Sequence, residues 1–377
     1  MKPLKIFMSA GEASGDMHGA PLIETMRRMN PGVEITFLGG DLMARAAGHA
    51  PLIHYRDMAF MAFSEVIRHA GKIFGNLRAA KEAIGSERPD AVVLIDYPGF
   101  NFKLMKYAWS LGIPVYYYIA PKVWAWKEWR VKSMKRYCRK VLSILPFEEE
   151  YFRGKGLEVE YVGNPSLEEV DRREAALPPR EEFLEEWGLG DEEPLLALVP
   201  GSRRGEIRNN LPVMAAAAAR FPHLQPVIAA APAIGRELYI ETLQKAGLDE
   251  LPMVTDATFE LIRHSEAALV TSGTATLETA LLGTPQVVCY RANGSKVSYA
   301  LMRRLIKVDY VSLPNLIEAG SLGAGKGKGV KYSQEGGMVA EMLLHRCTPE
   351  LVAAELARKR YHLVMANIVA DVIIPLA

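Results

Sequence analysis

The sequence predicts an α/β protein built from two Rossmann-like, doubly wound domains. Three observations lead to this prediction. The 377 residues exceed the size at which a single hydrophobic core usually stops growing. Short apolar runs alternate with amphipathic stretches, as in repeated strand–helix–strand units. This alternation stops in an acidic, polar stretch over residues 168–194 and then starts again, so each half should fold around its own parallel sheet.

Each half contains five short apolar or β-branched runs that we expect to be strands. In the first half they begin at residues 5, 34, 91, 115 and 140, and they read KIFMS, EITFLGG, AVVLID, VYYYIA and KVLSILP. In the second half they begin at residues 195, 226, 253, 267 and 286, and they read LLALVPGS, PVIAAA, MVTD, AALVTSG and QVVCYR. We therefore expect a first domain over 1–167, a linker over 168–190, a second domain over 191–350 and a helical tail over 351–377.

Composition excludes several classes of function. The chain has 45 basic and 44 acidic residues, so no overall field favours nucleic acid as a partner. Its three cysteines are far apart and no histidine cluster lies near them, which argues against a disulfide framework or a zinc site and fits a reducing cytoplasm. The first apolar run is too short for a signal peptide, and no run reaches the length of a membrane-spanning helix.

The stretch IFMSAGEASGDMHGA over residues 6–20 looks at first like a nucleotide-binding turn. Its glycine spacing fits neither the Rossmann turn nor the P-loop, and Glu12 and Asp16 would repel a phosphate. We expect a tight strand-to-helix turn over residues 9–15 at the carboxyl edge of the sheet, where α/β domains bind ligands. A structural alternative stays open, in which Ser14 or Asp16 only caps the following helix.

A carboxylate ends the third predicted strand, because AVVLID closes on Asp96. This position places Asp96 at the same carboxyl edge, where partial burial would suit a general base. The alternative is that Asp96 merely caps the turn formed by the following YPGFN. The strand alone does not decide between the two.

Two turns of the second half suit phosphates. LVPGSRRGEI over residues 198–207 joins a strand to a helix through Gly201, Ser202 and Arg203, so that helix amides and a guanidinium could bind a diphosphate. The alternative is a pair of solvated arginines. Downstream, residues 272–274 offer hydroxyl and amide donors in a second such turn, and Glu278 lies one turn into the next helix, where it could accept from ribose hydroxyls.

Eight segments in a fixed order resemble one known family. They are SAGEASGD, LIDYPGFN, YYYIAPKVWAWKEWRVK, LPFEEEYF, YVGNP, PGSRRGEI, SGTATLE and KVDYVSLPNL, and the likeness covers roughly residues 4–317. The chain is thereby similar to lipid-A-disaccharide synthases, which are inverting glycosyltransferases of the GT-B type, with two Rossmann-like domains facing a cleft. The resemblance implies transfer of 2,3-diacylglucosamine from its UDP donor to 2,3-diacylglucosamine 1-phosphate, giving a β-1',6-linked disaccharide phosphate and UDP.

The resemblance also implies the roles of individual residues. Asp96 would be the base that activates the acceptor 6-hydroxyl. The acceptor or transferred sugar would contact residues of the first domain, namely Ser9, Gly11, Glu12, Ser14, Gly15, Asp16, Asn101 and Trp124. The UDP moiety would contact residues of the second domain, namely Gly201, Ser202, Arg203, Glu206, Ser272, Gly273, Thr274, Glu278, Asn315 and Glu341. No metal or other cofactor is expected, since helix dipoles and Arg203 can take the charge of the departing UDP.

The lipid substrates imply a peripheral place on the cytoplasmic face of the inner membrane, with a homodimer as a further possibility. An apolar stripe beside basic residues runs through the segment 58–85 and suits a helix lying on an anionic membrane. Its candidate membrane residues are Phe60, Phe63, Arg68, Lys72, Ile73 and Phe74. An ordinary helix that faces the core fits the periodicity equally well.

The last part of the chain departs from the family pattern. A glycine and lysine run at 320–329 separates the Leu-Pro-Asn segment from AEMLLHRC, in which Leu344 stands where glutamine is expected. The tail is short, so its usual return to the first domain is in question. Two other functions therefore stay open: another GT-B enzyme that uses a UDP-sugar, and a nucleotide- or lipid-binding homologue with impaired catalysis.

Overall fold

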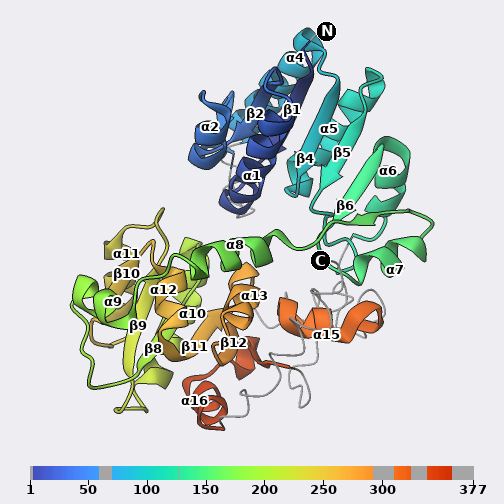
Figure 1. The fold of residues 1–377 in the computed structure, drawn as a ribbon. Coiled ribbons are helices and arrows are strands. Elements are labelled where there is room, and N and C mark those ends of the chain that lie inside the picture. The colour runs from blue at the N-terminus through green and yellow to red at the C-terminus, as the bar shows by residue number, and fades with distance from the viewer. Residues whose placement is uncertain (1–2, 59–69, 126, 292–309, 324–337, 359–377) are drawn as a thin grey trace. The chain divides into compact units, whose positions relative to one another are not determined.

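The computed structural model describes residues 3–58, 70–125, 127–291, 310–323 and 338–358 (Figure 1). The candidate membrane residues Phe60, Phe63 and Arg68 lie outside these ranges. The chain divides into two compact units, Met1–Gly163 and Asn164–Ala377. Each unit is described by itself below.

The N-terminal unit is built on a seven-stranded parallel sheet in the order β3-β2-β1-β4-β5-β6-β7. Its strands are β1 (Lys5–Ala10), β2 (Glu34–Gly39), β3 (Ile53–His54), β4 (Ala91–Ile95), β5 (Val115–Tyr118), β6 (Lys140–Ser143) and β7 (Glu160–Tyr161). Its described helices are α1 (Ala13–Met29), α2 (Asp41–Ala47), α4 (Ala70–Glu87), α5 (Pro98–Ser110), α6 (Arg130–Tyr137) and α7 (Glu148–Arg153), with a 3-10 turn at Tyr55–Asp57.

The C-terminal unit repeats this architecture with six parallel strands in the order β10-β9-β8-β11-β12-β13. The strands are β8 (Leu195–Val199), β9 (Gln225–Ala230), β10 (Met253–Thr255), β11 (Ser265–Thr271), β12 (Gln286–Tyr290) and β13 (Ala340–Leu343). The described helices are α8 (Pro165–Glu174), α9 (Arg180–Trp187), α10 (Arg204–Ala218), α11 (Arg236–Lys245), α12 (Thr258–Arg263), α13 (Thr274–Leu281), α15 (Leu313–Gly323) and α16 (Pro349–Ala357), with a 3-10 turn at Leu344–Arg346.

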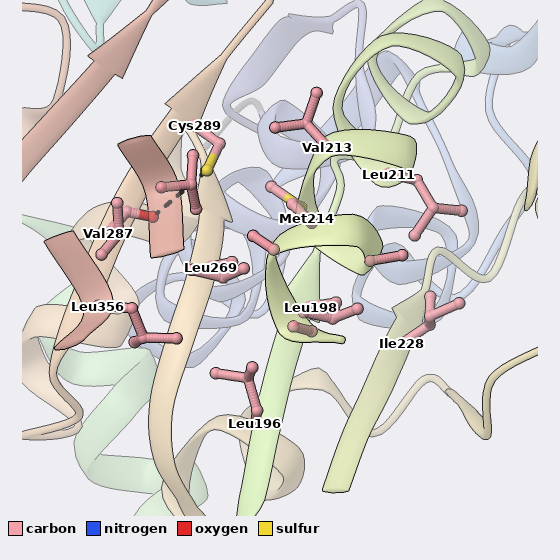
Figure 2. Packing of buried hydrophobic residues seen from close by; sticks show 14 of the residues in the cluster. Leu196, Leu198, Leu211, Val213, Met214, Ile228, Leu269, Val287, Cys289 and Leu356 are labelled. Carbon is pink, nitrogen blue, oxygen red and sulfur yellow. Dashed lines mark hydrogen bonds between the residues drawn. The ribbon is translucent and has the colours of Figure 1, made fainter. Parts of the chain in front are cut away.

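The strand sequences explain why both sheets are covered on two faces. All five residues of β8 are buried, and alternate residues belong to different cores. Leu196 and Leu198 pack with the alanine-rich helix α10 on one face, as Figure 2 shows. Leu195, Ala197 and Val199 pack on the other face, in a cluster to which α8 and α9 contribute Val170, Phe183 and Leu184.

Each sheet has one point at which the strand order reverses. In the N-terminal unit it lies between β1 and β4, where Ala10 pairs with Ile95. In the C-terminal unit it lies between β8 and β11, where Val199 pairs with Val270. The loops that follow the two strands diverge there, and open α/β sheets bind ligands at such points.

The fold confirms the α/β prediction and all ten expected strands, and it adds three that were not predicted, β3, β7 and β13. The division falls after Gly163, whereas we expected it after residue 167. The stretch expected as a linker carries α8 and α9, which pack into the C-terminal unit. The described part of the tail, α16, packs against α10 of the same unit. Among the described residues, no helix is both long and apolar enough to cross a bilayer.

Candidate functional site

A buried asparagine ties together the two strand ends at the reversal point of the N-terminal sheet. Asn101, on α5, is fully buried and accepts the hydroxyl hydrogen of Ser9 at 2.7 Å. Its amide nitrogen faces the carbonyl oxygens of Ser9 at 3.3 Å, Ile95 at 3.2 Å and Asp96 at 2.8 Å. Ser9 and Asn101 therefore hold the ends of β1 and β4 in register from inside the protein.

Asp96 follows β4 in an unusual backbone conformation. Both Asp96, with a φ of 41°, and Tyr97, with a φ of 45°, occupy the left-handed region without being glycine. The Asp96 carbonyl accepts two hydrogen bonds, one from the Asn101 amide and one from the hydroxyl of the buried Tyr117 at 2.7 Å. Two such residues in succession cost on the order of 1–3 kcal/mol each, so the surrounding bonds must stabilise the turn. The half-buried side chain of Asp96 thus leaves the sheet in a direction that its backbone sets.

Gly11 is needed because the Tyr97 ring lies against it. A β-carbon at residue 11 would stand 2.1 Å from Cδ1 of Tyr97. The Tyr97 hydroxyl donates to the carbonyl of Met58 at 2.8 Å, which fixes the ring across the turn. Burial, together with the negative charge of Glu12, raises the pKa of Tyr97 to about 12. Tyr97 therefore stays neutral and forms a wall between the turns that follow β1 and β4.

Asp16 has a structural task that decides its orientation. Its buried carboxylate accepts from the backbone N–H groups of Gly40 at 2.6 Å, Leu42 at 3.1 Å and Met43 at 3.1 Å. These groups belong to the first turn of α2, whose N-terminus Asp16 therefore caps from another helix. A contact of this carboxylate with a sugar stays a prediction.

The remaining small residues of this turn lie in the first turn of α1. Ser14 is half-buried, and Gly15 is buried against Ala10, where an added β-carbon would stand 3.1 Å from the Ala10 side chain. Glu12 precedes the helix with no side-chain capping bond to it. The structure thus brings six predicted residues to one turn, from Ser9 to Asp16.

Trp124 is held in the core by a buried acid. Its indole Nε1 donates to Oε1 of Glu148 at 2.9 Å, and both side chains are almost fully buried. Burial raises the pKa of the Glu148 carboxyl to about 7, and the bonds from Trp124 and Leu145 oppose this shift. Trp124 packs at 5.2 Å between ring centroids against Phe147. Its direct contact with a sugar stays a prediction.

In the C-terminal unit, the turn after β8 presents a basic side chain. Gly201 has a φ of 107°, and a β-carbon there would stand 2.5 Å from Oε2 of Glu206. Arg203 forms the N-cap of α10, and its Nη1 lies 2.8 Å from Oε1 of Glu206. Ser202 and Arg203 are exposed. The turn therefore offers a guanidinium at a helix N-terminus, where anions bind well.

The neighbouring turn after β11 is organised by a second buried asparagine. Asn210, on α10, donates to Oγ1 of Thr271 at 3.1 Å and accepts from the backbone N–H of Arg291 at 2.8 Å. It thus fixes the ends of β11 and β12 as Asn101 fixes those of β1 and β4. The Ser272 hydroxyl donates a hydrogen bond to the carbonyl of Val311 at 2.9 Å. Gly273 and Thr274 follow at the start of α13.

Glu278 is half-buried on α13, next to a charged cluster on α8. Burial raises the pKa of its carboxyl to about 7; nearby Arg173 lowers this pKa and the negative charge of Glu169 raises it. Arg173 is 2.5 Å from Glu169 and stacks 4.6 Å from the Phe259 ring centroid. A carboxyl with this pKa can accept hydrogen bonds from hydroxyl groups once it ionises.

Asn315 and Glu341 contact each other inside the C-terminal unit. The Glu341 carboxylate accepts from the backbone N–H of Val311 and Ser312, from the Ser312 hydroxyl at 2.6 Å and from the Asn315 amide at 2.9 Å. Both side chains are buried, and burial raises the pKa of Glu341. Glu341 therefore stabilises the N-terminus of α15, and its contact with a nucleotide stays a prediction.

The described membrane candidates lie on α4. Phe74 is 64% exposed, Ile73 is half-buried, and Lys72 forms an ion pair at 2.7 Å with Asp57. Within the described ranges, no group of three or more His, Cys, Asp or Glu side chains is arranged to hold a metal ion.

Sequence reasoning missed Tyr97, Tyr117 and Asn210. Tyr117 and Asn210 are buried and Tyr97 is half-buried, and a polar atom removed from water in this way needs a partner inside the fold. Tyr117 could have been suspected, because it shares the buried face of β5 with Val115. The partners of Asn210 lie 61 and 81 residues away, so no local pattern indicates them.

The family model and the similar sequences identify one family. Residues 6–324 match the family model described as lipid-A-disaccharide synthetase. A lipid-A-disaccharide synthase of Myxococcus xanthus is 38% identical over 360 residues, which cover 94% of this chain and 88% of that protein. A lipid-A-disaccharide synthase of Koribacter versatilis is also 38% identical, over 83% of this chain and 81% of that protein.

Solved structures show the same architecture at low sequence identity. A UDP-GlcNAc 2-epimerase of Methanocaldococcus jannaschii, in complex with UDP-GlcNAc and UDP, has a TM-score of 0.58 at 11% identity and covers 94% of this chain and 92% of its own. The glycotransferase of kitacinnamycin has a TM-score of 0.54 at 13% identity, with coverages of 98% and 94%. With the two parallel sheets, these likenesses show a two-domain, Rossmann-like fold of the GT-B type.

Proposed function

Because the chain belongs to the lipid-A-disaccharide synthase family of glycosyltransferases, we propose that it transfers diacylglucosamine from a UDP donor to diacylglucosamine 1-phosphate. The products are a β-1',6-linked disaccharide phosphate and UDP. Inversion requires in-line attack of the acceptor hydroxyl on the anomeric carbon of the donor, so the protein must supply a base and must stabilise the leaving group.

The base that we propose is Asp96. The observation that carries this assignment is its backbone, because the bonds from Asn101 and Tyr117 to the Asp96 carbonyl hold a strained turn at the reversal point of the sheet. Strain of this kind gathers at functional sites, where it aims a side chain. In this arrangement the carboxylate accepts the proton of the acceptor hydroxyl while the C–O bond forms.

Asp96→Asn tests this assignment, because asparagine has nearly the same side-chain shape as aspartate but lacks the carboxylate that would act as the base. We expect transfer to fall by at least about a hundredfold, with the fold and the UDP affinity unchanged. Asp90→Asn is the matched control, since Asp90 is exposed at the opposite end of β4 and accepts from the backbone N–H of Lys5 at 2.8 Å. Normal turnover by the Asp96 variant would remove this residue from the mechanism.

On the donor side, we propose that the turns after β8 and β11 hold the diphosphate. Arg203 supplies a fork of N–H donors, and α10 and α13 present their N-termini at neighbouring strand ends. Glu278 is proposed to accept from the ribose hydroxyls. Wild-type protein that binds UDP but forms no disaccharide would instead indicate a nucleotide-binding homologue.

We also propose that the enzyme works at an anionic membrane surface, with α4, α5 and α6 facing the lipid. Three aromatic side chains on or beside these helices are well exposed: Phe74 by 64%, Trp109 by 46% and Trp129 by 65%. Within their bounds, α5 and α6 contain no acidic residue and six basic ones, namely Lys103, Lys106, Arg130, Lys132, Lys135 and Arg136. Amphipathic aromatic rings beside cations fit the headgroup region of an anionic bilayer.

Sedimentation with vesicles tests this surface. Trp109→Ser should weaken binding to anionic vesicles at every salt concentration, whereas Lys106→Gln should matter mainly below about 0.15 M salt, where screening is weaker. Met29→Ser is the control, because Met29 is 81% exposed at the end of α1. Unchanged sedimentation with a lowered melting temperature would mean that Trp109 only stabilises the fold. Dimer formation stays a prediction.

A further inference from the structure

We propose that Arg130, with Lys127 beside it, binds the phosphate group of the acceptor sugar. This inference rests on the proposed transfer reaction and extends it, because it assigns a phosphomonoester subsite to two residues that no comparison connects with a ligand and of which Arg130 was considered above only for its charge beside the membrane. The proposal depends on where Arg130 lies, on what holds its guanidinium and on what remains available to bind.

Arg130 is the first residue of α6, which follows the loop after β5. Strands β5 and β4 are neighbours, and Tyr118 pairs with Ile95, the residue before Asp96. The loop therefore leaves the sheet at the same carboxyl edge as the proposed base. A residue here can reach a ligand that Asp96 also contacts.

Aromatic rings, and not a carboxylate, hold the guanidinium. The Cζ atom of Arg130 lies 5.1 Å from the ring centroid of Phe102 and 5.8 Å from that of Trp129. Within the described part of the chain, Arg130 forms no ion pair. The nearest acid in sequence, Glu128, is directed to Lys155 at 2.5 Å and to the Tyr151 hydroxyl at 3.3 Å. Stacking orients a guanidinium and leaves its N–H edge for a planar or tetrahedral anion.

Two further contacts connect Arg130 with the base. Phe102 packs against Tyr117 with 5.8 Å between ring centroids, and the Tyr117 hydroxyl donates to the Asp96 carbonyl. Burial and the charge of Asp96 raise the pKa of Tyr117, whereas the charge of Arg130 lowers it. The guanidinium and the carboxylate therefore act on the same buried hydroxyl. The acceptor carries its attacking hydroxyl at one end of the sugar ring and its phosphate at the other. It therefore needs a carboxylate for the hydroxyl and a cation for the phosphate.

Lys127 adds a second cation at this place. It takes a left-handed φ of 57°, and its carbonyl accepts the backbone N–H of Arg130 at 2.9 Å, so the two residues share one turn. Burial and the positive charge of Arg130 both lower the pKa of Lys127. A phosphomonoester, which carries about −1.5 to −2 charge at neutral pH, would relieve this repulsion and accept from both side chains.

The test compares two acceptors in neutral detergent micelles, so that lipid charge does not contribute. One is diacylglucosamine 1-phosphate and the other is the same sugar without its phosphate. For Arg130→Gln, we expect kcat/KM to fall by about tenfold to a hundredfold with the phosphorylated acceptor, as for loss of a hydrogen bond to a charged group. With the dephosphorylated acceptor, the variant and the wild type should agree within about threefold, because the partner of Arg130 is already missing.

Arg139→Gln is the matched control. Arg139 is an exposed arginine directly before β6, at the edge of the sheet opposite Asp96, and it should not distinguish the two acceptors. If the Arg130 variant loses kcat/KM equally with both acceptors, Arg130 only packs against its neighbours and does not bind the phosphate. If kcat/KM does not fall with either acceptor, Arg130 does not belong to the site. An inactive wild type would overturn the proposed transfer but not the phosphate subsite. In that case calorimetry with both acceptors still tests the subsite, because Arg130→Gln should weaken binding of the phosphorylated acceptor alone.

Discussion

Glu148→Gln should make the stability of the N-terminal unit less dependent on pH. Glu148 is 1% exposed, and its carboxyl accepts from the Trp124 indole at 2.9 Å and from the backbone N–H of Leu145 at 3.4 Å. Glutamine keeps an acceptor for Trp124 but cannot ionise. It therefore isolates the cost of burying the charge of Glu148 from the packing of its side chain.

The size of the effect follows from the pKa. Burial raises the pKa of Glu148 from 4.5 to about 7, so the folded protein binds a proton more tightly than the unfolded chain does. The stability that this proton contributes is complete below the unfolded pKa and is lost as the pH rises through the folded pKa. Between pH 5 and pH 8 the wild type should lose about 2 to 3 kcal/mol from this group, and the variant should not.

Urea unfolding at pH 5 and at pH 8 measures this difference. Tryptophan fluorescence mainly follows the N-terminal unit, because four of the five tryptophans precede residue 164. At pH 5 the variant should be the less stable protein by about 1 kcal/mol, since its amide nitrogen no longer accepts from Leu145. At pH 8 the order should reverse. Glu150→Gln on the same helix is the control, and parallel pH profiles for Glu148→Gln and the wild type would refute the reasoning.

Three other substitutions have defined outcomes. Gly11→Ala should displace the Tyr97 ring, lower stability by about 1 to 3 kcal/mol and reduce transfer, whereas a normal melting temperature would show that the turn yields without cost. Asn210→Ala should cost about 2 to 3 kcal/mol in urea unfolding, because Thr271 and a backbone N–H lose a buried partner; an unchanged midpoint would contradict this. Arg203→Ala should weaken UDP binding by about 1.5 to 3 kcal/mol in calorimetry, and equal affinity would leave the arginine as solvated surface.

The alternation of apolar runs with amphipathic stretches was sufficient to predict both sheets, because a strand that helices cover on both faces must be apolar along its whole length. The three strands that the sequence did not reveal, β3, β7 and β13, have only two to four residues, and neighbours in the sheet decide their pairing. Asp16 shows the limit for side chains. Its residue type suggested a helix cap, but the helix that it caps begins 25 residues later, at Asp41.

The candidate site divides in the same way. The places of Asp96 and Arg203 at the carboxyl edges of the sheets could be predicted, since Asp96 directly follows a strand and Arg203 directly precedes a helix, whereas their roles stay predictions. The contacts that orient Asp96 could not be predicted, because Tyr117 and Asn101, the latter expected at the sugar, meet the Asp96 carbonyl only after β4, β5 and α5 have packed. Asn315 and Glu341 were expected at the nucleotide, and their mutual hydrogen bond across 26 residues is a tertiary contact without a local signal.

At Asp96, selection for thermal stability and selection for activity should favour different residues, because the turn has a left-handed backbone. Glycine reaches the same backbone conformation without steric cost, so Asp96→Gly would release on the order of 1 kcal/mol of stored strain. With the proposed role of Asp96 as the base, a library screened for thermal survival alone should accumulate glycine at this position and contain many stable but inactive proteins. A screen that also demands disaccharide formation should keep the aspartate and find its gains elsewhere in the chain.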